Sequence, residues 1–322
     1  MRLSRRQTET QSPDMSMMRI AVAGTGGLAR LIAHYIDDET SHHVMLLSRS
    51  QQPALAARGF QISVVDYTDA QSLTFALKGI DTVISTVTGS SQVNLIRAAV
   101  AARVRRFAAS EFEGLPSLRP AGDPLDRRRS DATRWLQHYA QNIMSTVFVC
   151  GIFYERFQPG GLARSLVGLN TGFSGEGDYI LDIANMRAQV PALTAEGQPV
   201  MMCMTAIQDV ARFVTRAIDL PTWPPELRMC GERLSVQNLV LVAQHLKKQT
   251  FNPSVMHNPA TLRAELAVAA AQGDRPRGIR LQTLIATAEG RYDFMQPNMN
   301  AAFPDITPKR FAQWFVEKWD LQ

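Results

Sequence analysis

The strongest constraint on this chain comes from residues 20–36, which read IAVAGTGGLARLIAHYI. An apolar run leads into a glycine-rich turn and then into apolar residues at helical spacing, and the turn fits the pattern G-x-G-x-x-A. In this pattern the first glycine allows the tight turn, the second lets the backbone approach a diphosphate, and the small third residue lets the helix pack on the strand. The free N–H groups and the dipole of the helix favour negative charge. The segment predicts a dinucleotide held by Gly24, Thr25, Gly26, Gly27, Leu28 and Ala29.

Strand-like and helix-like segments alternate along the first half of the chain. After residues 20–23, the strand candidates are 44–48, 60–65, 80–86, 106–110 and 145–150, and the helix candidates between them include 28–36, 53–58, 71–78, 91–103 and 131–141. Strands separated by helices are typical of a parallel sheet covered on both faces. The sequence therefore predicts an α/β fold with a Rossmann-like, doubly wound parallel sheet.

Composition excludes several classes of protein. The chain has 322 residues, of which 45% are hydrophobic and 20% charged, an ordinary globular balance that can bury a core. No run of 18 apolar residues occurs, so we expect no membrane span. The net charge of +5 is spread along the chain, which gives no reason to expect direct nucleic-acid binding. No carboxylate or histidine cluster predicts a metal site.

The cysteines and the N-terminus bear on the compartment. The chain has three cysteines, widely spaced and without a C-x-x-C pair, which argues against a disulfide framework and against a zinc module. Residues 1–16 are expected to be a disordered tail, and they lack the apolar stretch of a secretory signal. We expect a cytoplasmic protein. A mitochondrial alternative rests on Arg2, Arg5 and Arg6, against which Glu9 and Asp14 count.

The end of the second predicted strand selects the cofactor. An NAD-binding protein places Asp or Glu there, about 20 residues beyond the glycine turn, to bind the ribose hydroxyls. Here the strand ends in Ser48, Arg49 and Ser50, with no acid. A guanidinium flanked by hydroxyls suits a ribose 2′-phosphate, so we expect NADP(H). Further along, Asp66 suits the adenine amine, and Thr86, Val87 and Thr88 suit the nicotinamide half.

Beyond Cys150 the pattern becomes loop-rich and then helical. Glycines punctuate 151–177, which predicts a mobile wall of a site. Thr205 and Gln208 form a predicted capping box that opens a helix, and a strand follows at 227–230. Further helices are expected from Ser235 to Lys248, over 260–271, and over 307–319 with Pro308 in the first position.

A family resemblance rests on residues 64–114. The pattern D-x-x-D-x-x-S-L-x-x-A-L-K-G-x-D-x-V-I-S-T spans 66–86, and R-F-x-x-S-E-F spans 106–112. This segment resembles isoflavone reductases and NmrA-like proteins, and GIFYERF at 151–157 is similar to their fungal branch. The resemblance implies an atypical short-chain dehydrogenase/reductase fold that binds NADP(H), with Gln92, Ser110, Glu111 and Phe112 beside the cofactor.

The resemblance also implies a small C-terminal lobe over a cleft. On this basis we expect an NADP-binding Rossmann domain over 17–158 and 205–250. The substrate-binding lobe would then comprise 159–204 and 251–322.

The chain departs from this family at the expected proton donor. Plant members use a lysine at the start of the helix before the sixth strand, where this chain has Asp126 to Asp131 and no lysine between residues 79 and 246. A Tyr-x-x-x-Lys motif is also absent. Arginine stabilises an oxyanion but does not release a proton near neutral pH. We therefore expect Arg128 or Arg129 to supply electrostatics while water or Tyr154 supplies the proton; the alternative is that these arginines face solvent.

Three functions are compatible with these features. Phe153, Tyr154, Phe157 and Met204 are candidates for an apolar substrate pocket, with ordinary core packing as the alternative. The first function is an NADP(H)-dependent reductase of a small hydrophobic, aromatic or polyketide-like carbonyl, enone or imine compound, in secondary metabolism. The second is a redox-neutral isomerase or cyclase with a structural or recycled cofactor. The third is a non-enzymatic NADP-sensing regulator. A monomer and a homodimer are both compatible with the sequence.

Overall fold

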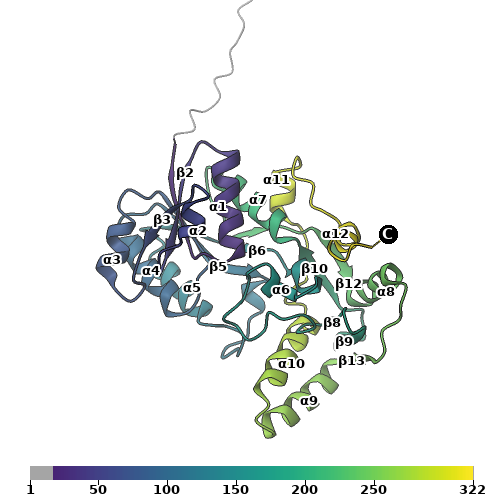
Figure 1. Ribbon diagram of the computed structural model, residues 1–322. Coiled ribbons are helices and arrows are strands. Elements are labelled where there is room, and N and C mark those ends of the chain that lie inside the picture. The colour runs from purple at the N-terminus through teal and green to yellow at the C-terminus, as the bar shows by residue number, and fades with distance from the viewer. Residues whose placement is uncertain (1–16, 322) are drawn as a thin grey trace, which may run out of the picture.

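The fold is built on a seven-stranded parallel sheet, shown in the computed structural model of the chain, which describes residues 17–321 (Figure 1). The strand order is β11-β6-β5-β4-β1-β2-β3. The strands are β1 Arg19–Ala23, β2 His43–Ser48, β3 Gln61–Val64, β4 Thr82–Ser85, β5 Arg106–Glu113, β6 Met144–Val149 and β11 Glu226–Arg228. The predicted Rossmann-like sheet is confirmed. The predicted tail, residues 1–16, lies outside the described residues.

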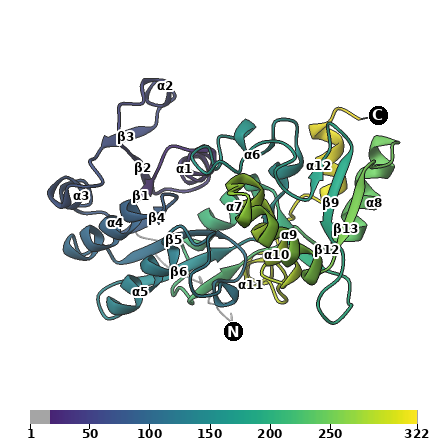
Figure 2. The same ribbon diagram turned by 90° about the horizontal axis from the view of Figure 1, so that it is seen from below.

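Helices cover both faces of this sheet, which is why its central strands are almost wholly buried (Figure 2). On one face, α1 (Gly27–Glu39) packs with α7 (Ile207–Ala217) in a shared hydrophobic core. On the other face lie α3 (Ala70–Ala76), α4 (Ser90–Ala101) and α5 (Arg129–His138). The short helix α2 (Pro53–Ala56) follows β2. The carboxyl ends of the parallel strands therefore share one edge of the sheet.

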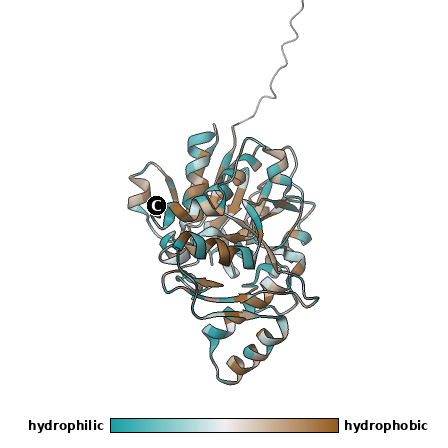
Figure 3. Cartoon of the chain, turned by 90° about the vertical axis from the view of Figure 1, so that its right-hand side faces the viewer, coloured by the Kyte–Doolittle hydropathy of each residue, from teal (hydrophilic) through white to brown (hydrophobic). Residues whose placement is uncertain are grey.

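A second lobe is formed by two three-stranded sheets and a separate core. One sheet has the order β12-β10-β7, with β7 Ile152–Phe153, β10 Met201–Thr205 and β12 Glu232–Ser235. The other has the order β13-β9-β8, with β8 Leu181–Asp182, β9 Arg187–Pro191 and β13 Ser254–His257. Its helices are α8 Val236–Lys247, α9 Pro259–Ala271, α10 Arg275–Ala288 and α12 Phe311–Lys318. The α9–α10 pair projects from the rest of the molecule, and both hydrophilic and hydrophobic residues lie along it (Figures 1 and 3).

Four short elements lie between the longer helices and strands. They are the 3-10 turns η1 (Pro116–Leu118) and η2 (Tyr154–Phe157) and the helices α6 (Gly161–Arg164) and α11 (Asn298–Ala302). Residues of α11 pack in the core shared by α1 and α7, whereas α8 packs in the core of the second lobe. The sequence division had grouped α8 with the large sheet. No helix among residues 17–321 has the length and apolar character needed to cross a bilayer.

Two helix starts differ from the sequence predictions because tertiary partners replace local caps. Thr205 ends β10, and its hydroxyl donates to the Cys150 carbonyl at 2.8 Å, so it does not form a capping box. The first amide of α7 is instead bound by the Glu155 carboxylate at 3.1 Å. The last helix begins at Phe311 and not at Pro308, and the Phe311 amide donates to Glu232 at 2.8 Å.

Candidate functional site

A cavity of about 630 Å³ opens at the carboxyl ends of β1, β2, β4 and β5. Its walls include the glycine turn 24–29, the β2 tip 47–50 and residues 86–88 after β4. Residues 110–113 at the end of β5 and the segment 166–171 complete much of the lining. Ligands in open α/β sheets bind at this edge, so the cavity lies where the fold predicts a dinucleotide.

The glycine turn fits a dinucleotide phosphate. Gly24 has a φ of 114°, and a Cβ there would overlap the Thr86 hydroxyl oxygen, so only glycine suits this position. The α1 helix begins with no side-chain cap and no acidic residue in its first turn. Within residues 17–321, the amides of Leu28 and Ala29 have no hydrogen-bond acceptor. Free amides at a positive helix end are the arrangement that binds a diphosphate.

One amide of this turn already has an acceptor from the chain. The Gly27 amide donates to the Leu166 carbonyl at 2.9 Å, and a Cβ at Gly27 would overlap the Ser165 carbonyl. We call residues 162–173 the strap, because this segment crosses the N-terminal end of α1 and lines the cavity with Leu162, Leu166, Val167 and Phe173, among others. The strap therefore closes one wall of the site by a backbone contact.

The β2 tip brings Ser48, Arg49 and Ser50 to the cavity. Ser48 donates to the Ser50 carbonyl at 2.7 Å, which shapes the turn. Arg49 is exposed and has no ion-pair partner among residues 17–321, so its guanidinium is available to a ligand. Asp66 does not line the cavity. Its carboxylate accepts hydrogen bonds from the amide and hydroxyl of Thr68 at 2.8 and 2.7 Å, which lowers its pKa and makes it a turn residue.

Residues after β4 and within β5 line the other half of the cavity. Thr86, Val87, Thr88, Ser110, Glu111 and Phe112 all contribute to its wall. Gln92 is fully buried behind this wall and accepts a hydrogen bond from the Ser110 amide at 2.6 Å. Gln92 therefore supports β5 and does not line the cavity itself.

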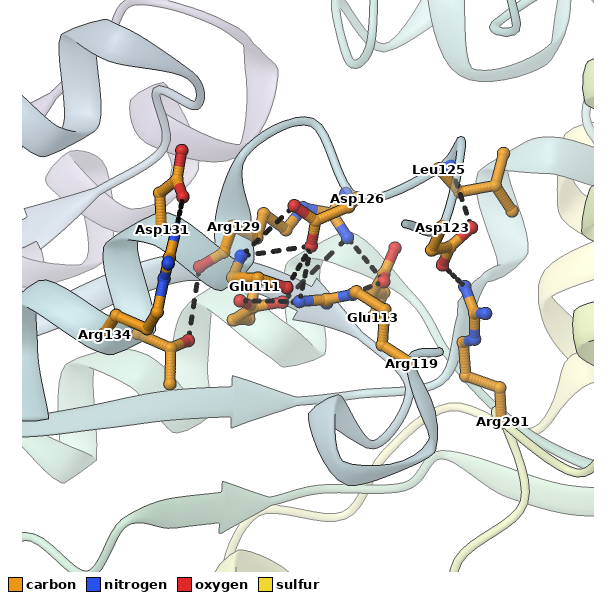
Figure 4. Close-up of polar contacts among 12 residues, drawn as sticks. Glu111, Glu113, Arg119, Asp123, Leu125, Asp126, Arg129, Asp131, Arg134 and Arg291 are labelled. Carbon is orange, nitrogen blue, oxygen red and sulfur yellow. Dashed lines mark hydrogen bonds and ion pairs between the residues drawn. The ribbon is translucent and has the colours of Figure 1, made fainter. Parts of the chain in front are cut away.

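A buried ionic cluster backs this half of the site (Figure 4). Arg119 pairs with Glu111, with Glu113 at 3.2 Å and with Asp126 at 3.3 Å, and Arg129 pairs with Glu113. The side chains of Arg119 and Glu111 are 3% and 1% exposed. Burial raises the pKa of Glu111, and Arg119 opposes this shift by hydrogen bonding and charge. Burial also opposes ionisation of Glu113, but Arg129 and Arg119 outweigh it and lower its pKa.

The arginine run at the start of α5 divides between two environments. Arg129 is buried and lines the cavity, but its guanidinium already forms an ion pair with the Glu113 carboxylate. Arg128 turns away from the cavity, where its guanidinium donates to Ser90 at 2.6 Å and to Asp131 at 2.8 Å. Arg128 is thus a surface residue, and the predicted electrostatic role is not available to it.

Three of the four predicted pocket residues belong to the core of the second lobe. Tyr154, Phe157 and Met204 are at most 1% exposed and do not line the cavity. The Tyr154 hydroxyl donates to the Lys309 carbonyl at 3.2 Å, and burial raises its pKa. Tyr154 cannot reach a ligand in the cavity and is not a candidate proton donor. Phe153 does line the cavity, as does its neighbour in β7, Ile152.

The sequence analysis missed a tyrosine on the cavity wall, Tyr292. Its hydroxyl has no hydrogen-bond partner in the described part of the chain, and burial raises its pKa to about 12. The backbone at this position is fixed on both sides, since Leu115 donates to the Arg291 carbonyl at 2.9 Å and Cys203 to the Tyr292 carbonyl at 2.8 Å. The buried Arg291–Asp123 ion pair at 2.7 Å holds the same segment (Figure 4).

Arg156 also lines the cavity and was not predicted. Its guanidinium lies over the rings of Phe173 and Tyr179, at 4.9 and 5.5 Å from their centroids. Residues 291–292 follow a helix that the sequence did not predict. Arg156 lies within GIFYERF at 151–157, but nothing in that segment marks its side chain as a ligand-binding one. Among residues 17–321, no group of three or more His, Cys, Asp or Glu side chains could hold a metal ion.

Comparison with known proteins agrees with this geometry. Residues 23–143 match the family model described as NAD(P)H-binding. "Oxidoreductase BOA1" of Botryotinia fuckeliana is 27% identical over 319 residues, covering 92% of this chain and 98% of that protein.

Solved structures share the whole fold. AtPrR2 with NADP+ and (+)pinoresinol is 20% identical, with a TM-score of 0.67 over 93% of this chain and 98% of that one. An isoflavone reductase is 18% identical, with a TM-score of 0.67 over 94% of this chain and 99% of that one. The chain thus has an NAD(P)H-binding domain over residues 23–143, and its predicted resemblance to isoflavone reductase-like and NmrA-like proteins is confirmed.

Proposed function

We propose that this protein is an NADP(H)-dependent reductase. The observation that carries the proposal is the cavity itself, which joins the glycine turn and the exposed cation at the β2 tip to a second half lined by aromatic and ionisable side chains. Arg49 stands where an NAD-binding protein has a carboxylate, which favours the 2′-phosphate of NADP(H). The names of the similar proteins, an oxidoreductase, an isoflavone reductase and a protein solved with NADP+ and (+)pinoresinol, support the same reaction class.

The substrate proposed is a small aromatic or polyketide-like carbonyl, enone or imine compound of secondary metabolism. Phe153, Ile152, Leu162 and Phe173 give the cavity apolar surface for such a body. The described cysteines are all unpaired thiols, which supports a reducing compartment such as the cytoplasm.

The chain's own contribution to the reaction is to bind, orient and protonate. When bound, reduced nicotinamide supplies the two electrons and one hydrogen that the substrate carbon gains. Tyr292 holds a proton on a hydroxyl that faces the cavity, and we propose that it gives this proton to the substrate oxygen or nitrogen and regains one from water. A pKa near 12 keeps the hydroxyl protonated at neutral pH. The neighbouring Arg156 and Arg129 stabilise the phenolate that forms.

Cofactor titration tests the first part of the proposal. Wild-type protein is expected to bind NADPH at least about tenfold more tightly than NADH, since a charged hydrogen bond contributes about 1.5–3 kcal/mol. Arg49→Gln should remove most of this preference and leave NADH binding unchanged. Equal loss for both cofactors would contradict the role of Arg49, and failure of both to bind would refute the proposed function.

A matched pair of tyrosine variants tests the proton donor. With an aromatic α-diketone as probe, substrate-dependent loss of NADPH absorbance should fall about 10²–10⁴-fold in Tyr292→Phe. Tyr154→Phe loses a hydroxyl of the buried core and should keep the wild-type pH profile. Product formed without net NADPH consumption would support a redox-neutral reaction. Tight NADP binding without turnover of any carbonyl compound would support a regulator.

A further inference from the structure

Arg156 is a cation on the cavity wall that forms no ion pair with any described residue. The η2 turn sends Tyr154 and Phe157 into the core and leaves Arg156 on the cavity wall. Among residues 17–321, no carboxylate lies within ion-pair distance of its guanidinium. Phe173 and Tyr179 hold the guanidinium by cation–π contacts, so its position is fixed without neutralising its charge.

The acidic residues that act on Arg156 do so without an ion pair: Glu113 and Asp178 favour its charge, but neither lies within ion-pair distance among the described residues. Glu111 and Glu113, which line the cavity, are paired with Arg119 and Arg129. The exposed Arg127 also lines the cavity and forms no ion pair within the described residues. This half of the cavity therefore has positive charge in excess, and burial lowers the pKa of Arg156, as expected for a cation without a counter-ion.

The phosphates of the cofactor do not account for Arg156. In the sheet order, β2, which carries Arg49, lies on one side of β1, whereas β6 lies beyond β4 and β5 on the other side. Arg156 follows β6 and β7 in the chain and lines the cavity with Tyr292 and Phe173. The glycine turn after β1 would hold the diphosphate, and the β2 tip would hold the ribose 2′-phosphate. Arg156 therefore lies in the part of the cavity that is left for substrate.

We propose that the substrate of this reductase is an organic acid, whose carboxylate binds Arg156 while its apolar body lies against Phe153, Leu162 and Phe173. A guanidinium pairs with a carboxylate through two parallel hydrogen bonds, which also fixes the orientation of the reacting group. The inference rests on the proposed function and adds a substrate class to it: a carbonyl, enone or imine compound that carries an acid group.

Binding of a matched pair of probes tests this inference. To NADP+-saturated protein, 2-naphthoate is expected to bind ten- to a hundredfold more tightly than 2-naphthamide, which has the same body without the charge. Arg156→Gln should remove the difference, and Arg156→Lys should restore part of it. Arg275→Gln removes an exposed charge from α10, an element that does not line the cavity, and should behave as wild type.

Three outcomes would overturn the inference. They are equal affinity for the two probes in wild type, an unchanged preference in Arg156→Gln, and inorganic phosphate binding as tightly as naphthoate. The wild-type comparison needs no variant, so it decides the question even if Arg156→Gln does not fold. NADPH binding and turnover of a neutral diketone are measured alongside. If both persist without a preference for the acid, the substrate class is wrong and the reductase stands.

Discussion

Replacing Arg119 would measure how much the buried ion pairs behind the cavity contribute to the free energy of unfolding. Its side chain is 3% exposed and contacts Glu111, Glu113 and Asp126 (Figure 4). Arg119→Met keeps the apolar volume but leaves Glu111 with Arg129 at 3.9 Å as its remaining ion-pair partner. Breaking a buried pair in this way costs about 3–5 kcal/mol, because one charge stays buried without compensation.

The assay is urea unfolding followed by tryptophan fluorescence, without cofactor. Arg119→Met should lower the free energy of unfolding by about 3–5 kcal/mol. The control is Arg134→Met, which breaks the ion pair between Arg134 and Asp131, both on α5. Because Arg134 is 76% exposed, we expect this change to cost at most about 1 kcal/mol.

Two further measurements could refute the reasoning. Adding Glu111→Gln to Arg119→Met should recover about 1 kcal/mol or more, since the unpaired charge is removed as well. Burial raises the pKa of Glu111, and without Arg119 it should rise further, so the carboxyl gains a proton as the pH falls. The penalty of Arg119→Met should therefore be smaller at pH 5.5 than at pH 8. Additive effects and equal penalties at the two pH values would show that the cluster is not a coupled charge network.

Two other predictions follow from buried contacts. Burial raises the pKa of Glu155 to about 7 from 4.5, so its contribution to stability is complete below pH 4.5 and is lost as the pH rises through 7. The loss is about 3 kcal/mol, and urea unfolding of Glu155→Gln should be flatter over this interval; an unchanged pH dependence would contradict the assignment. Gly27→Ala should push the strap away at a cost of about 1–3 kcal/mol, because its Cβ would overlap the Ser165 carbonyl. Amide hydrogen exchange over residues 162–173 should then accelerate, and unchanged protection would contradict the contact.

The parts of the fold that sequence patterns predicted are those fixed by local constraints. The glycine turn at 24–29 and the parallel strands depend on backbone conformation and on apolar runs, which adjacent residues reveal. The Ser235 cap of α8 is of the same kind, since its hydroxyl accepts from the Asn238 amide at 3.0 Å. Thr205 fits the same local pattern, but its hydroxyl donates instead to the carbonyl of Cys150, the residue after β6.

The second half of the site could not be predicted because distant segments build it. Tyr154 and Tyr292 are equally plausible from composition. Both are buried in the core of the second lobe, and only its packing places Tyr292 on the cavity wall. The sequence does not distinguish the arginines at the start of α5. In the fold, Arg129 pairs with a carboxylate of β5, whereas Arg128 lies on the surface and pairs with Asp131. Which arginine stays without an ion-pair partner depends on contacts between segments that are distant in the sequence. No residue spacing predicts those contacts.

The strap contact has a consequence for the order of events at this site. One N–H group donates a full-strength hydrogen bond to one acceptor, so a phosphate oxygen that binds the Gly27 amide competes with the Leu166 carbonyl for it. The Leu166 carbonyl thus supplies an acceptor for a donor that would otherwise be unsatisfied. Exchange of oxidised for reduced coenzyme then involves the same competition, which ties the speed of repeated cycles to the backbone of the strap.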